Sequence, residues 1–96
     1  MRDIMEKIGL PAVLEQLGEE GGEVVQASLK YARLLRGENP TPKTEEQCID
    51  DLTEEIADVW LCINILIQCG VIDEYRMMRI MYSKRVRWKR RIADHK

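Results

Sequence analysis

The 96-residue sequence has no run of eighteen consecutive apolar residues, so it holds no candidate for a membrane-spanning helix. Its first residues, MRDIMEKIGLPAVLEQ, have neither an unbroken apolar stretch nor a small-residue cleavage site. We therefore expect a cytoplasmic protein that does not bind a membrane.

Cysteine is scarce, with three residues at Cys48, Cys62 and Cys69. Their odd number and their spacing match no CxxC or Cys/His pattern, which argues against a disulfide framework and a structural zinc site. We expect Cys62 and Cys69 to be small buried apolar residues. No segment alternates like a strand, and no repeat or linker divides the chain, so we predict a single all-α domain over residues 1–96.

The composition, with 45% hydrophobic and 33% charged residues, is that of a folded, water-soluble domain. Charge is divided unevenly along it. Residues 1–73 carry six basic and fifteen acidic side chains, a net charge of −9, whereas residues 74–96 carry nine basic and two acidic ones, a net charge of +7. An acidic body joined to a basic last helix could bind cations and anions side by side, although a solvated basic face is an equally good explanation.

Four helices are predicted, and each has a recognisable beginning or end. They cover residues 3–8, 11–36, 44–69 and 73–93. Pro11 suits the first turn of a helix, Thr44 with Gln47 has the form of a capping box, Gly70 is a C-terminal stop, and Asp73 is an N-cap.

The segment from Gly37 to Pro42 holds one glycine and two prolines, and it predicts the main loop. The fold class is therefore an antiparallel bundle of three long helices plus a short N-terminal one. A domain this small, with a second long helix that is apolar nearly all round, has more apolar surface than three helices cover. We expect oligomerisation to complete a four-helix-bundle-like core, in a homodimer or a homotetramer.

One acidic side chain interrupts the apolar stripe of the first long helix, and a second lies beside it. The stripe recurs at helical spacing through Val13, Leu17, Val24, Ala27 and Tyr31. Glu20 fills its one vacant position, so we expect this side chain to point toward the core. Glu23 lies roughly 60° around the helix axis from Glu20, and both carboxylates can reach one point.

The second long helix repeats this arrangement in more apolar surroundings. In the segment IADVWLCINILI, residues 56–67, Asp58 and Asn64 are the only polar residues. A carboxylate in such a segment is strongly disfavoured unless it is paired or bound to a cation, and Glu55 lies three residues before Asp58. We prefer a metal site to salt bridges with Lys30, Arg33 or the last helix. An all-oxygen ligand set without histidine or cysteine favours Mg²⁺ or Mn²⁺ over zinc.

The two acidic motifs, EEGGE at residues 19–23 and EIAD at residues 55–58, are separated by thirty-one residues. This ordered pair resembles the EExxE and ExxD signature of the MazG-like, all-α nucleoside triphosphate pyrophosphohydrolases. The surrounding segments LGEEGGEVVQASLKYARLLRGENPTP and LTEEIADVWLCINIL are also similar to that family, so the resemblance covers about residues 10–70.

The resemblance implies an Mg²⁺-dependent enzyme that cleaves the bond between the α- and β-phosphates of a nucleoside triphosphate, giving a monophosphate and pyrophosphate, and clears unwanted nucleotides. Glu20, Glu23, Glu55 and Asp58 match the family's metal ligands. Glu19 matches the leading glutamate, which serves a second ion or orients water. Either Glu19 or Glu23 could accept the proton of the attacking water.

Basic residues should hold the triphosphate. Lys30, two helical turns after Glu23, is the first candidate. Lys84, Arg87 and Arg91 share a face of the last helix and could bind phosphate. Trp88 stands where the family commonly has an asparagine four residues after its lysine; it could stack on a base, but we expect it to pack in the core.

A second departure from the family is the pair Gly21 and Gly22, because relatives commonly have a helix former before the glycine. Each glycine costs a helix roughly 1 kcal/mol, so we expect a helix or a nucleotide to approach the backbone there.

Two other functions compete with the enzyme. One is a nucleic-acid-binding module that uses the basic last helix, which leaves Asp58 unexplained. The other is a non-catalytic MazG-like protein that binds metal or nucleotide.

Overall fold

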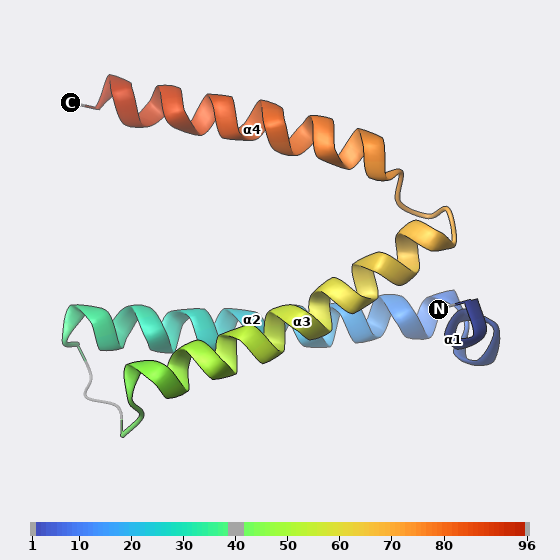
Figure 1. Ribbon diagram of the computed structural model, residues 1–96, viewed down its shortest axis with the longest axis horizontal. Coiled ribbons are helices and arrows are strands. Elements are labelled where there is room, and N and C mark those ends of the chain that lie inside the picture. The colour runs from blue at the N-terminus through green and yellow to red at the C-terminus, as the bar shows by residue number, and fades with distance from the viewer. Residues whose placement is uncertain (1, 39–41, 96) are drawn as a thin grey trace.

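The computed structural model describes residues 2–38 and 42–95, and its regular structure is helical throughout (Figure 1). The elements are α1 (Arg2–Ile8), α2 (Leu10–Arg36), α3 (Glu45–Gln68) and α4 (Glu74–Asp94). No strand occurs among the residues described. The all-α class and the four predicted helices are confirmed, with ends that differ from the predicted ones by at most one residue.

The helix ends follow from the residues that cap them. The Thr44 hydroxyl accepts from the Gln47 amide at 3.1 Å, and the Gln47 side chain accepts from the Thr44 amide at 2.9 Å, which confirms the capping box. The Asp73 carboxylate caps α4 by accepting from the Arg76 amide at 3.1 Å. Gly70 follows α3 with φ +78°, a conformation that glycine adopts without strain. Of the predicted loop, residues 39–41 lie outside the described part of the chain.

The core lies between α2 and α3, which form an antiparallel pair that we call the hairpin (Figure 1). Val13, Ile65 and Leu66 are buried where the start of α2 packs against the end of α3, and the half-buried Met5, Leu17 and Ile72 pack around them. Helix α1 contacts both helices and closes this end of the hairpin. Near the other end, the Tyr31 hydroxyl donates to the Glu45 carboxylate at 2.9 Å, which raises the Tyr31 pKa.

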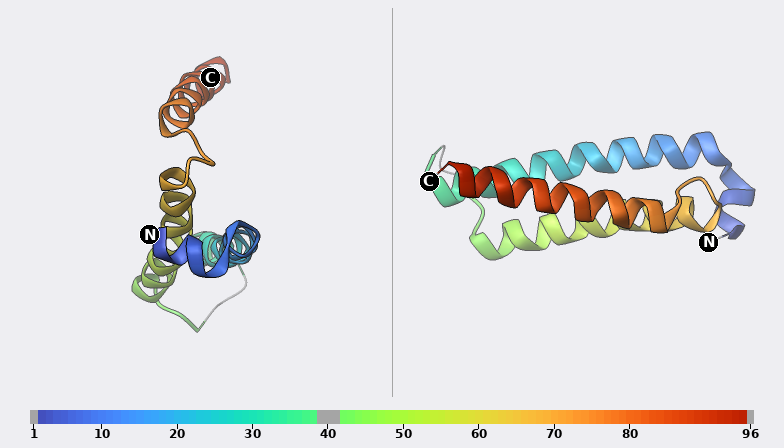
Figure 2. Two further views of the ribbon diagram at one scale, coloured as in Figure 1. Left: turned by 90° about the vertical axis from the view of Figure 1, so that its right-hand side faces the viewer. Right: turned by 90° about the horizontal axis from the view of Figure 1, so that it is seen from above.

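Helix α4 stands apart from the hairpin, as the left-hand view of Figure 2 shows. After a short connection it runs back and diverges from α3 (Figure 1). It barely contacts the other helices and has no buried residue. As a result, apolar side chains of α3 remain uncovered, which agrees with the expectation that three helices cannot cover this helix. Ile56 is 47% exposed and Trp60 is 54% exposed.

Two smaller observations complete the fold. Cys62 is buried as expected, whereas Cys69 is exposed because it lies at the open C-terminal end of α3, so the prediction for Cys69 is wrong. Among the helices described, none combines the length and the apolar character that crossing a membrane requires.

Candidate metal centre

Three acidic side chains predicted from the sequence meet between α2 and α3. Glu20, Glu55 and Asp58 each offer a carboxylate oxygen, and these three oxygens lie within 4.8 Å of one another. The α2 stripe that supplies buried Val13 brings Glu20 toward α3, while Asp58 lies one turn before buried Cys62 on the side of α3 that packs on α2. We call these three residues the acid triad.

The spacing of the triad suits a small divalent cation. Mg²⁺ binds oxygen at about 2.1 Å in an octahedron, so ligands on opposite sides of the ion lie about 4.2 Å apart. Neighbouring ligands of the octahedron lie about 3.0 Å apart. Three oxygens within 4.8 Å of one another are close to the spacing that one shared ion needs. All three residues are half-buried, which leaves room for water or substrate oxygens at the remaining positions.

The electrostatics of the triad also favour a cation. Partial burial raises the pKa of the Glu55 carboxyl, and the negative charges of Glu23, Glu20 and Asp58 raise it further. Repulsion among like charges thus disfavours the ionised form of Glu55. A bound cation would remove this penalty.

Two neighbours of the triad were not predicted from the sequence. The Gln16 side chain donates to the Glu20 carboxylate at 2.7 Å and holds it in place from one turn earlier on α2. Burial raises the pKa of the Cys62 thiol, and the charges of Glu20 and Asp58 raise it further. The sequence spacing could have identified both residues. Each stands four positions from a triad member and therefore shares its helix face.

The other predicted acidic residues lie outside the triad. Glu19 and Glu23 are exposed, although the charge of Glu23 reaches Glu55. Asp58 is half-buried instead of buried, because α2 and α3 alone do not enclose it and α4 barely contacts the hairpin. No charged residue of the described chain is fully buried. The ion pairs Arg36–Glu38 and Lys43–Asp51 include no triad member.

Three of the four predicted basic residues lie on α4. Lys84, Arg87, Trp88 and Arg91 line one shallow pocket of about 290 Å³. Trp88 is 70% exposed, so the expectation that it packs in the core is wrong for this chain: α4 has no helix against it there. Lys30 is exposed on α2.

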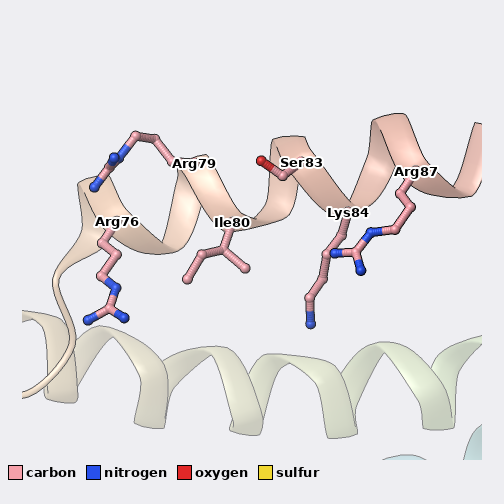
Figure 3. A pocket seen from close by; sticks show the side chains of 6 residues that line it. All are labelled: Arg76, Arg79, Ile80, Ser83, Lys84 and Arg87. Atoms are coloured by element: carbon pink, nitrogen blue, oxygen red, sulfur yellow. The ribbon is translucent and has the colours of Figure 1, made fainter.

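Part of the basic surface of α4 is directed at the hairpin. In Figure 3, Arg76, Ile80 and Lys84 point from α4 toward α3, while Arg79 points away. Arg79 instead lies over the Tyr75 ring, 5.1 Å from its centroid. Sequence reasoning missed Arg76, which precedes Lys84 by two turns and is recognisable only once α4 is placed over α3.

The double glycine of α2 has no close neighbour. A Cβ atom added to Gly21 or to Gly22 would meet no atom within 4 Å. The expected close approach of another helix to this backbone is therefore absent within the described chain. Both glycines lie inside a continuous helix, one turn or less from Glu20 and Glu23.

Comparison of the chain with protein-family models, with curated proteins and with solved structures finds no match in any of the three. The function therefore has to be argued from the triad, the basic face of α4 and the sequence motifs.

Proposed function

We propose that this protein is an Mg²⁺-dependent nucleoside triphosphate pyrophosphohydrolase of the MazG-like kind. One observation carries the proposal: Glu20 from the EEGGE motif and Glu55 and Asp58 from the EIAD motif converge within 4.8 Å. The motifs resemble the family signature, and three carboxylates this close together support a shared cation. Such an enzyme would clear unwanted (d)NTPs in the cytoplasm.

Each acidic residue has a distinct role in this proposal. The triad would hold Mg²⁺ or Mn²⁺, with Glu23 as a further ligand that approaches from the exposed side. The ion would supply charge neutralisation at the phosphate oxygens and a lower pKa for coordinated water. Hydrolysis adds one water across the α–β anhydride, and Glu19 or Glu23, both exposed, would accept its proton.

The triphosphate would be held by basic side chains of α4 and α2. Lys84 points from α4 toward α3, and Arg87 and Arg91 share a pocket with it. Exposed Trp88 lines the same pocket and offers a ring for base stacking. Lys30, exposed on α2, is available from the hairpin itself. We further propose that association of copies, as a dimer or a tetramer, completes the bundle.

The proposal is tested by incubating the protein with a panel of (d)NTPs and Mg²⁺ and measuring nucleotide and pyrophosphate products. We expect a nucleoside monophosphate and pyrophosphate in equal amounts. Asp58→Ala and Glu20→Ala should abolish both products. The matched control is Glu46→Gln, since Glu46 is an exposed acidic residue of α3 outside the triad.

The competing functions predict different results when the same protein is tested with nucleotides and nucleic acid. Absence of product from every nucleotide, together with salt-sensitive binding to DNA or RNA, would replace the enzyme with a nucleic-acid-binding module. Absence of product with Mg²⁺-dependent nucleotide binding would indicate the non-catalytic alternative. The converging triad argues against the first of these, because nucleic-acid binding gives it no role.

A further inference from the structure

The chain is far more extended than a closed domain of its size. Its radius of gyration is 17.0 Å, against about 12.5 Å for a compact domain of 96 residues. Its accessible surface is 7872 Å², whereas a compact monomer of 11.2 kDa exposes about 5,700 Å². About 2,200 Å² per chain is therefore left open by the position of α4.

Part of this open surface forms an apolar groove between the hairpin and α4. The groove has a volume of about 510 Å³. Its apolar lining comes from α2, α3, the connection and α4, namely Leu17, Ile63, Leu66, Val71, Ile72, Met77, Ile80 and Met81.

An exposed stripe on α3 extends the groove toward the start of that helix. At roughly 100° per residue, Ile49, Ile56 and Trp60 fall on the same side of α3 as Ile63, which lines the groove. They are 43%, 47% and 54% exposed. The spacing of seven, four and three residues is that of a helix face that packs against another helix.

The charge and area of the chain identify what covers this surface. Residues 1–73 carry a net charge of −9 and residues 74–96 carry +7, so each chain presents both halves of a complementary pair. A two-fold axis would place each basic α4 against the other acidic hairpin. If each copy buried its excess of about 2,200 Å², the dimer would bury about 4,400 Å² of accessible surface in total. This area is within the range of obligate homodimer interfaces. Nucleic acid would instead be repelled by the hairpin.

We propose that a second copy of this chain occupies the groove, with the α4 of each copy packed on the α3 stripe of the other. The inference deepens the association proposed above by naming its surface and its exchange of α4. It does not depend on catalysis, because it rests on shape, apolar area and charge. Its test measures mass and contacts, whereas the proposed hydrolysis is tested by product formation.

Light scattering coupled to size exclusion measures the mass of the assembly. We expect the wild-type chain to have at least twice the 11.2 kDa mass of one copy. Trp60→Glu and Ile56→Glu, which place a charge in the stripe, should each raise the dissociation constant by at least about 30-fold. The matched control Leu29→Glu should keep the wild-type mass, because Leu29 is 52% exposed on the side of α2 opposite buried Val13.

Cross-linking of the wild-type chain tests the same contacts without a substitution that could impair folding. Equal amounts of ¹⁴N- and ¹⁵N-labelled protein are mixed under denaturing conditions, refolded and treated with a carbodiimide. We expect peptides that join α4 lysines to α3 carboxylates to carry mixed isotopes. A wild-type mass of 11.2 kDa, same-isotope cross-links alone, or an oligomer unaffected by both stripe variants while circular dichroism shows them folded would each overturn the proposal.

Discussion

The hairpin and α4 are built from the same kind of amphipathic helix, yet they differ in what surrounds them. The hairpin holds the buried core and the acid triad, with a net charge of −9 up to residue 73. Helix α4 has no buried residue, and the final 23 residues, 74–96, carry a net charge of +7. One region thus attracts cations, and the other attracts anions.

This division suggests that the two regions contribute different parts of one site. The hairpin is fixed by its own packing, so the triad can form without α4. The basic face of α4 can act on a ligand of the triad only when α4 is held near α3, whether by its own hairpin or by that of a second copy. Variants of the two regions should therefore fail in different ways.

The largest effect is expected for metal binding by the hairpin. Mg²⁺ at about a hundred times its dissociation constant should raise the free energy of unfolding by about 2.7 kcal/mol. Asp58→Asn should remove this increase, because it deletes one of the three converging carboxylates. Thermal or denaturant unfolding with and without Mg²⁺ measures it. Equal Mg²⁺ stabilisation of Asp58→Asn and of the control Glu46→Gln would show that the triad is not the metal site.

A smaller effect is expected for substrate binding by α4. Arg87→Ala should raise KM for the nucleoside triphosphate by roughly 10-fold through loss of a charged hydrogen bond, while kcat and Mg²⁺ stabilisation stay unchanged. Arg85→Ala is the matched control, since Arg85 is an equally exposed arginine of α4 outside the pockets described. Steady-state kinetics distinguish the two. The same rise in KM for both variants would mean that general positive charge, and not this face, binds phosphate.

The double glycine offers a test of the hairpin at the level of helix stability. Gly22→Ala should raise the free energy of unfolding by about 1 kcal/mol, because the added methyl group meets no atom within 4 Å and lowers the cost of helix formation. Urea unfolding measures the change. If the variant is more stable but loses nucleotide hydrolysis, the glycine is kept for close approach of substrate. If the variant is less stable than wild type, the helix at Gly22 does not have the free space for a methyl group that the structure shows.

The smallest effect is expected for Glu55. Its contribution to the free energy of unfolding should be unfavourable without metal and favourable with bound Mg²⁺. The folded-state pKa of Glu55 lies above the ordinary 4.5, so the native state binds this proton more tightly than the unfolded state does. Stability without metal should therefore fall as pH rises from 4.5 through the raised pKa, and the loss should persist at neutral pH.

Glu55→Gln should accordingly stabilise the metal-free protein at neutral pH and flatten this part of the pH profile. With saturating Mg²⁺ the order should reverse, because the wild-type chain gains a ligand that glutamine supplies poorly. Melting temperatures in EDTA and in Mg²⁺, across pH 4.5–8, measure both statements. A variant that is less stable than wild type in EDTA at neutral pH would contradict the repulsion among the acidic side chains.

The helices could be predicted from the sequence because local interactions specify them. Thr44 and Gln47 satisfy each other's backbone amides, and Asp73 caps α4, with no contribution from distant residues. The convergence of Glu20 with Asp58 could also be predicted, since each interrupts an apolar helix face and two such faces must pack together.

Exposure could not be predicted in the same way, because it depends on how helices are placed relative to one another. Trp88, Trp60 and Asp58 all lie in sequence patterns typical of buried residues, yet the first two are exposed and Asp58 is half-buried. The position of α4 decides each case. The effect of the Glu20 charge on the Cys62 thiol likewise depends on how α2 packs against α3, because the two residues lie on different helices.

The sequence by itself determined the four helices, their caps, the uneven charge and the acidic positions that face the core, because periodicity and capping act within a few residues along the chain. Only the tertiary structure decided which carboxylates form the triad, which basic side chains point toward α3, and which apolar face remains uncovered. Those outcomes depend on the crossing of α2 with α3 and on the separation of α4, and helix packing over long sequence distances sets both.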